Sequence, residues 1–161
     1  MRKASVWPAQ WPTIPREIAE AVDAAVGAAV SSNVAAFFEA TEDLAALPAE
    51  RVRVVLAAIV REILETMHPD GLTGEDVQEV LAHAVGVART WMPDVDVASF
   101  VAVLTGALGV AEADESDLPT SAVPSAILLI ADLVSSAQVS VHDYVRRALD
   151  EVARAEIVEM P

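Results

Sequence analysis

Apolar residues recur at helical spacing along almost the whole chain, and this periodicity constrains the fold more than any other feature of the sequence. The clearest case follows Pro48, where AERVRVVLAAIVREILETM, residues 49–67, places apolar residues on one face at every helical turn. The Val-rich segments keep the same period and are interleaved with Ala, so none shows the strict alternation of a half-buried strand. The sequence therefore predicts an all-α fold.

The same pattern predicts a single-domain bundle of about six helices joined by short turns. Residues 15–47 form either one long helix or two, because Ser31, Ser32 and Asn33 are poor inside a helix and good at its start. The later helices are expected over residues 49–67, 74–91, 97–109, 125–137 and 141–159. The helix at 97–109 is apolar on nearly every face, which indicates the centre of the bundle or a subunit interface, and the helix at 125–137 is mostly apolar.

The 161 residues correspond to one domain, which we divide into an N-terminal arm, residues 1–14, and a bundle, residues 15–160. The arm carries two Trp-Pro pairs, at Trp7 and Trp11, and each proline favours an extended conformation for the tryptophan before it. The indoles either fill a groove on their own bundle or anchor the arm on another subunit or partner. We favour the first arrangement, because termini fray unless they are tied down.

Charge and cysteine content exclude several classes of function. The net charge of −15 opposes binding to nucleic-acid phosphates and to anionic membranes, and it suits a basic protein partner. The chain has no cysteine, so it cannot form a disulfide, a thiolate nucleophile or a Cys-ligated zinc site. Pro8, Gln10 and Pro12 fall where an export signal needs an apolar run, so we expect a cytoplasmic protein. The apolar, uncharged stretch at residues 97–111 falls short of the roughly 20 residues that span a membrane.

The stretch MHPDGLTGEDVQEVL, residues 67–81, has the acidic content of a calcium-binding loop. If such a loop began at His68, Leu72 would occupy a ligand position and Thr73 the position that requires Gly, so we reject calcium. The residues instead predict a turn followed by a helix start. Thr73 is the expected N-cap, and Asp76, three residues later, completes an approximate capping box.

Paired carboxylates suggest a different chemistry near the N-terminus. Glu17-x-x-Glu20 and Glu39-x-x-Glu42 resemble the E-x-x-E and E-x-x-D motifs of all-α nucleoside triphosphate pyrophosphohydrolases, with Glu42 where that family has Asp. The resemblance implies a magnesium-dependent hydrolase if a sharp turn near residues 31–33 brings the two pairs together.

The histidines give no metal site. Glu79 and His83 share one helical face and could supply two ligands, but we favour a solvated pair. No set of nucleophile, base and orienting group is visible either. We assign no catalytic residue, no metal ligand and no cofactor, and we regard an enzyme as less expected than a binding protein.

These observations favour a non-enzymatic helical module for protein–protein interaction. The apolar surplus of residues 97–109 and 125–137 favours a homodimer, and the acidic surface favours a basic partner, as for an adaptor or an inhibitor of the immunity-protein kind. The alternatives are a regulator that binds a small molecule in an apolar pocket and the hydrolase above. The candidate partner-binding residues are Trp7, Trp11, Glu112, Asp114, Glu115 and Asp117.

Overall fold

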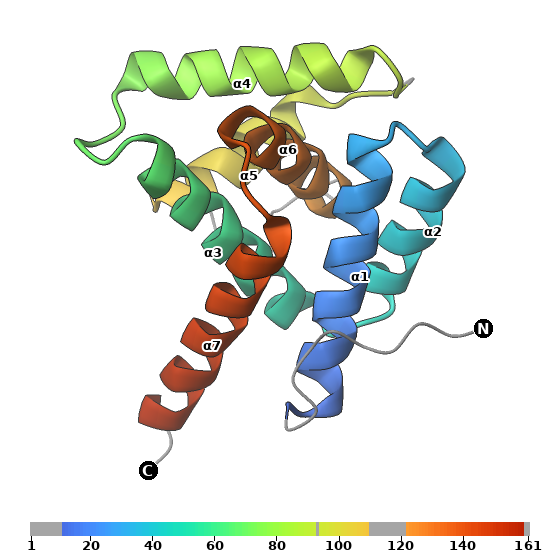
Figure 1. The fold of residues 1–161 in the computed structure, drawn as a ribbon, viewed down its shortest axis with the longest axis vertical. Coiled ribbons are helices and arrows are strands. Elements are labelled where there is room, and N and C mark those ends of the chain that lie inside the picture. The colour runs from blue at the N-terminus through green and yellow to red at the C-terminus, as the bar shows by residue number, and fades with distance from the viewer. Residues whose placement is uncertain (1–10, 93, 110–121, 160–161) are drawn as a thin grey trace.

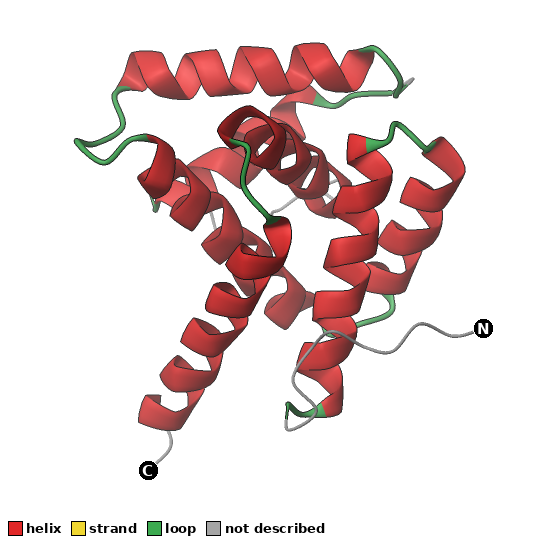
Figure 2. Cartoon of the chain, in the orientation of Figure 1, coloured by secondary structure: helices red, strands yellow, loops and turns green. Residues whose placement is uncertain are grey.

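The structure is a computed structural model, and it describes residues 11–92, 94–109 and 122–159, without the side chains of 155–159. These residues form seven α-helices and no strand, which confirms the all-α prediction (Figures 1 and 2). The helices are α1 (Thr13–Val30), α2 (Val34–Ala45), α3 (Ala49–Met67), α4 (Gly74–Arg89), α5 (Val97–Leu108), α6 (Ala122–Ala137) and α7 (Val141–Glu159).

Residues 15–47 form two helices, because the chain breaks at Ser31–Asn33. Ser32 has a positive φ of 54°, which ends α1, and the Asn33 side chain then accepts a hydrogen bond from the Ala36 N–H as the N-cap of α2. The two helices form a hairpin at one side of the molecule (Figure 1). The helix count is therefore seven instead of about six, and α1 begins at Thr13, two residues before Pro15.

Helix α6 is the centre of the bundle, a position that composition had suggested for residues 97–109. Every residue from Ser125 to Val134 is buried, and the helix contacts α1, α2, α3, α4 and α5 (Figure 1). Pro124 lies in the first turn, where a missing N–H breaks no helical hydrogen bond. These five helices pack around α6, so α6 determines where each of them lies.

Helix α5 is less central than its composition suggests. It buries Phe100 and Leu104 against the core but leaves Val97 and Val101 exposed. Its boundaries follow local chemistry: Asp96 caps the first turn by accepting from the Ala98 N–H, and Gly109 ends the helix at a φ of 72°.

Helices α4 and α7 lie on opposite sides of the centre. Helix α4 crosses one end of the bundle and contacts α6 and α5, whereas α7 runs beside α3 and α1 (Figure 1). Helix α7 packs on the bundle through Tyr144, Val145, Ala148 and Leu149, which are buried. Among the described residues, no helix is both long and apolar enough to cross a membrane.

Candidate functional site

An open hollow of about 280 Å³ lies where α4, α6 and the end of α1 meet. Small and apolar side chains form much of its surface, including Ala84, Ala88, Leu128 and Ala131, and Trp91 forms part of its wall. The space exists because the side chains of these alanines, on facing helices, are too small to fill it. We refer to this space as the hollow.

One polar pair borders the hollow, formed by His83 of α4 and Asp132 of α6. Nδ1 of His83 lies 2.8 Å from Oδ1 and 2.9 Å from Oδ2 of Asp132. The Asp132 side chain is only 7% exposed, whereas that of His83 is 61% exposed. An ionised carboxylate can only accept hydrogen bonds, so Nδ1 carries the proton and donates it. In the neutral ring the lone pair is therefore on Nε2, on the opposite side from Asp132.

Two exposed apolar side chains form part of the margin of this hollow. Val30 and Val87 line it directly and are 55% and 43% exposed. The ring of Phe37 lies edge-on to Trp91 with centroids 5.5 Å apart and also contacts the half-exposed ring of Phe38 at 5.9 Å. The aromatic contacts thus link the wall of the hollow to the outer surface of α2.

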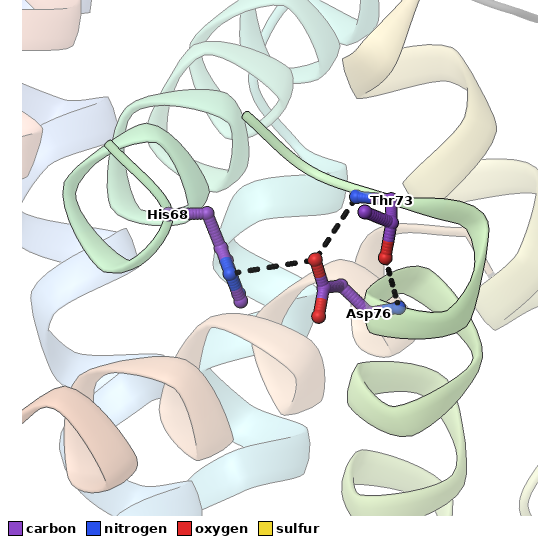
Figure 3. Close-up of polar contacts among 3 residues, drawn as sticks. All are labelled: His68, Thr73 and Asp76. Atoms are coloured by element: carbon purple, nitrogen blue, oxygen red, sulfur yellow. Dashed lines mark hydrogen bonds and ion pairs between the residues drawn. The ribbon is translucent and has the colours of Figure 1, made fainter. Parts of the chain in front are cut away.

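The calcium-like stretch is the connection between α3 and α4, and it forms the predicted capping box (Figure 3). The Asp76 N–H donates to Thr73 Oγ1 at 3.1 Å, and the Thr73 N–H donates to Asp76 Oδ2 at 2.9 Å. His68 Nδ1 lies 3.8 Å from the same Oδ2. The hydrogen bonds from the Thr73 backbone and side chain lower the pKa of Asp76, and His68 lowers it further. The acidic residue is thus used to start a helix.

The carboxylates of the hydrolase-like motif do not form a metal site in the structure. The turn at 31–33 does place α2 beside α1, but Glu17, Glu20, Glu39 and Glu42 are all exposed. Within the described ranges, no group of three or more His, Asp or Glu side chains could hold a metal ion. The convergence that the resemblance requires is therefore not found.

The predicted partner-binding residues fall mostly outside the described residues. Trp7, Glu112, Asp114, Glu115 and Asp117 all lie there. Trp11 is partly buried and packs against the core of its own bundle. This tryptophan therefore follows the intramolecular arrangement.

A second polar cluster lies between α3 and α7. Arg61 of α3 pairs with Glu151 of α7 at 2.8 Å, and the Tyr144 hydroxyl donates to Thr66 at 3.0 Å. Glu62 lies among them with a buried Oε2 that makes no hydrogen bond to a described residue. Burial raises the pKa of the Glu62 carboxyl, and the negative charge of Glu151 raises it further. These groups join two helices and border no cavity that we identify.

Sequence reasoning missed Asp132 and assigned His83 to Glu79 instead. The signal was present in AILLIADLVSSA, residues 126–137, where one aspartate interrupts an otherwise apolar segment that is too hydrophobic to be a surface helix. A carboxylate in such a helix requires a partner from another element. The hollow with its His83–Asp132 pair is the best candidate site in the described residues. No family model, curated protein or solved structure matches the chain.

Proposed function

We propose that the protein works by binding protein chains, and that it forms a homodimer through the face that contains the hollow. This hollow face consists of the hollow together with Val30, Val34, Phe38 and Val87. One observation carries the proposal: of the seven large apolar side chains that are exposed in the described residues, Val30 and Val87 line the hollow, and Val34 and Phe38 lie on the neighbouring helix α2. Apolar side chains gathered around a concave surface are typical of interaction sites.

The size of the hollow favours a protein side chain over a free ligand. Small-molecule sites usually measure about 300–1,000 Å³ and enclose most of the ligand. This hollow measures about 280 Å³, and its margin is formed by exposed residues such as Ser32, Val87 and Ser135. A hot-spot side chain inserted there would be surrounded by contacts that exclude water. A small-molecule regulator is the second candidate, favoured by the existence of the cavity itself.

The charge of the molecule favours a basic protein as an alternative occupant of the hollow face. The net charge is −15, and the α1–α2 hairpin beside the hollow carries exposed Glu20, Glu39, Glu42 and Asp43. Attraction of a basic chain to these groups is screened by salt, so such a complex would associate more slowly as salt is added. Homodimer contacts made by apolar side chains would persist under the same conditions.

Light scattering after size exclusion tests the proposal with a matched pair of variants. Val87→Asp places a charge on the margin of the hollow, and Val54→Asp places one on α3, at a residue of similar exposure that does not line it. We expect a dimer at micromolar concentration for the wild type and for Val54→Asp, and a monomer for Val87→Asp. A monomeric wild type would refute the homodimer, and equal effects of both charges would refute the assigned face.

A further inference from the structure

His83 has the surroundings by which proteins present an imidazole to a metal ion. A metal-ligating histidine almost always donates its other ring N–H to a carboxylate, a carbonyl or water, which fixes the ring and makes the free nitrogen more basic. Nδ1 of His83 lies 2.8 Å and 2.9 Å from the two carboxylate oxygens of Asp132, whose side chain is only 7% exposed. Nε2 is on the opposite side of a ring that is 61% exposed, so an ion can reach it from solvent.

A second metal-binding side chain lies one turn before His83 on α4. Glu79 is exposed, and because it is four residues from His83, the two Cβ atoms are about 5–6 Å apart on one side of the helix. Zn²⁺ accepts imidazole nitrogen and carboxylate oxygen together, whereas Ca²⁺ and Mg²⁺ prefer oxygen ligands alone. Spacing alone favours a solvated pair, but the buried carboxylate behind His83 adds the orientation that a zinc ligand requires.

One chain does not complete this set of ligands. Structural Zn²⁺ sites are four-coordinate, and in the part of the chain that the structure describes no group of three or more His, Asp or Glu side chains could hold a metal ion. Val87 lies one turn after His83, and both residues line the hollow. Glu79, His83 and Val87 therefore form one stripe of α4 at the margin of the face through which we propose that two copies meet.

We propose that two copies of the chain share one Zn²⁺ ion, which each copy binds through Nε2 of His83 and a carboxylate oxygen of Glu79. This inference rests on the proposed homodimer and names the ion that joins its two halves. A two-fold axis perpendicular to α4, between Glu79 and His83, makes the two α4 helices antiparallel and places each glutamate beside the histidine of the other copy. The two copies then supply the four ligands of a tetrahedral zinc site.

The charge of the chain gives such an ion a second effect. Each copy has a net charge of −15, so two copies repel one another as they approach. The charges of the two glutamates balance the double charge of Zn²⁺, and a ligating histidine is neutral. The ion therefore removes like-charge repulsion at the point where the two α4 helices meet.

Dimer dissociation constants measured by analytical ultracentrifugation of the untagged protein, in ZnCl₂ and in EDTA, test the shared site. Saturating Zn²⁺ should lower the Kd of the wild type about 30-fold or more, because the ion binds the dimer and stabilises it by mass action. Ca²⁺ and Mg²⁺ should have no such effect. In His83→Asn and Glu79→Gln the zinc effect should fall below about threefold, because each variant removes two of the four ligands. The asparagine amide can still donate to Asp132, so the bundle keeps this contact.

Three further variants separate the shared site from zinc bound elsewhere. Glu75→Gln removes the same charge from α4 about 12 Å along the helix from His83, and His142→Asn removes a histidine from α7. Both should keep the full zinc effect. Asp132→Asn leaves all four ligands in place and should weaken zinc binding about tenfold, because it loosens the orientation of His83. Titration calorimetry of the wild type should find one Zn²⁺ ion for every two chains.

The outcomes distinguish the shared ion from the homodimer. If the wild type dimerises equally well in zinc and in EDTA, the homodimer stands and the shared ion is refuted. One ion per chain, or a zinc effect that survives Glu79→Gln, would refute the four-ligand site. A dimer that forms only in zinc supports the ion and makes the homodimer depend on it. A wild type that is monomeric in both conditions overturns both proposals.

Discussion

Two interfaces of this bundle contain partly or fully buried carboxylates, and their surroundings differ. Between α4 and α6, both carboxylate oxygens of Asp132 lie within hydrogen-bonding distance of Nδ1 of His83. Between α3 and α7, Glu62 has a buried oxygen with no hydrogen bond to a described residue, and burial raises the pKa of its carboxyl. The first carboxylate is stabilised by a partner from another helix, whereas burial makes the charged form of the second less favourable in the folded protein. Burial of a carboxylate alone therefore does not indicate a functional site, and its hydrogen-bond partner must be identified as well.

The largest effect is expected when the partner is removed from Asp132. His83→Ala leaves a buried acceptor without its donor, which should lower the free energy of unfolding by about 1–3 kcal/mol. Urea unfolding followed by circular dichroism measures this loss. His83→Asn, which can still donate to Asp132, is the matched control and should retain most of the stability. Equal losses for the two variants would show that His83 contributes packing and not its hydrogen bond.

A smaller loss of stability is expected at the capping box, where the carboxylate of Asp76 and its partner Thr73 are three residues apart. Thr73→Ala removes the N-cap of α4 and should lower the free energy of unfolding by about 1 kcal/mol in the same urea experiment. Thr66→Val on α3 is unsuitable as a control because Thr66 bonds Tyr144, so exposed Thr13→Ala at the start of α1 is used instead. Added calcium should leave the melting temperature of the wild type unchanged, and a large rise would contradict the capping interpretation.

The pH dependence of the capping box has a definite sign. The hydrogen bonds from Thr73 lower the pKa of Asp76 in the folded protein. The stabilisation from ionised Asp76 is therefore present above the ordinary pKa of an aspartate and is lost as pH falls through the lower, folded value. Thr73→Ala keeps the backbone N–H that donates to Asp76 and removes only the smaller contribution of the side chain. Its difference from the wild type should therefore shrink only slightly at acid pH, and a difference that grows there would contradict this assignment.

The contrast between these two carboxylates also explains which parts of the structure the sequence predicts. Thr73 and Asp76 are three residues apart, so their contact follows from helix geometry alone. His83 and Asp132 are separated by 49 positions, and their contact exists because α4 packs on α6. Sequence spacing favoured the local pair with Glu79, whereas packing directs Nδ1 of His83 to the desolvated aspartate.

Helices α5 and α6 show that hydrophobic composition alone does not predict how deeply a helix is buried. Both segments are nearly free of charge, and the segment that forms α5 was expected at the centre or at an interface. Helix α6 has five neighbouring helices and is buried on all sides, whereas α5 contacts α3, α4 and α6 and leaves Val97 and Val101 exposed. Composition indicates that a helix can be buried, but the number of its neighbours depends on how the other helices pack. The hollow, which needs three helices, could not be predicted for the same reason.

On the α3–α7 side, the exposed ion pair should contribute little. Arg61→Ala removes the 2.8 Å contact with Glu151 and should lower the free energy of unfolding by about 0–1 kcal/mol, because exposed pairs are screened. Arg53→Ala, which removes a 2.7 Å pair with Glu50 within α3, is the matched control. Urea unfolding at low and high salt measures both. A loss at Arg61 well above that at Arg53 would show that the contact between helices holds α7 in place.

The smallest change in stability is expected for Glu62, and its sign distinguishes the α3–α7 interface from the α4–α6 interface. Because the pKa of Glu62 is raised in the folded state, the folded protein binds its proton more tightly than the unfolded chain does. That stabilisation is complete below the ordinary pKa of a glutamate and is lost as pH rises through the raised value. At neutral pH the ionised carboxylate therefore opposes folding, so Glu62→Gln should increase the free energy of unfolding there. Its advantage over the wild type should fall as the pH is lowered.

Urea unfolding of the wild type and Glu62→Gln from mildly acid to neutral pH measures this change. Glu151→Gln provides the internal comparison, because removing that negative charge lowers the raised pKa of Glu62 and should reduce the pH dependence. Asp132→Asn should have the opposite sign at neutral pH, since it weakens a charge-assisted bond that His83 already supplies. Glu62→Gln could instead destabilise the protein at neutral pH, as Asp132→Asn is expected to do. That result would show that the Glu62 carboxylate has a stabilising partner in the folded state, and that the two interfaces do not differ.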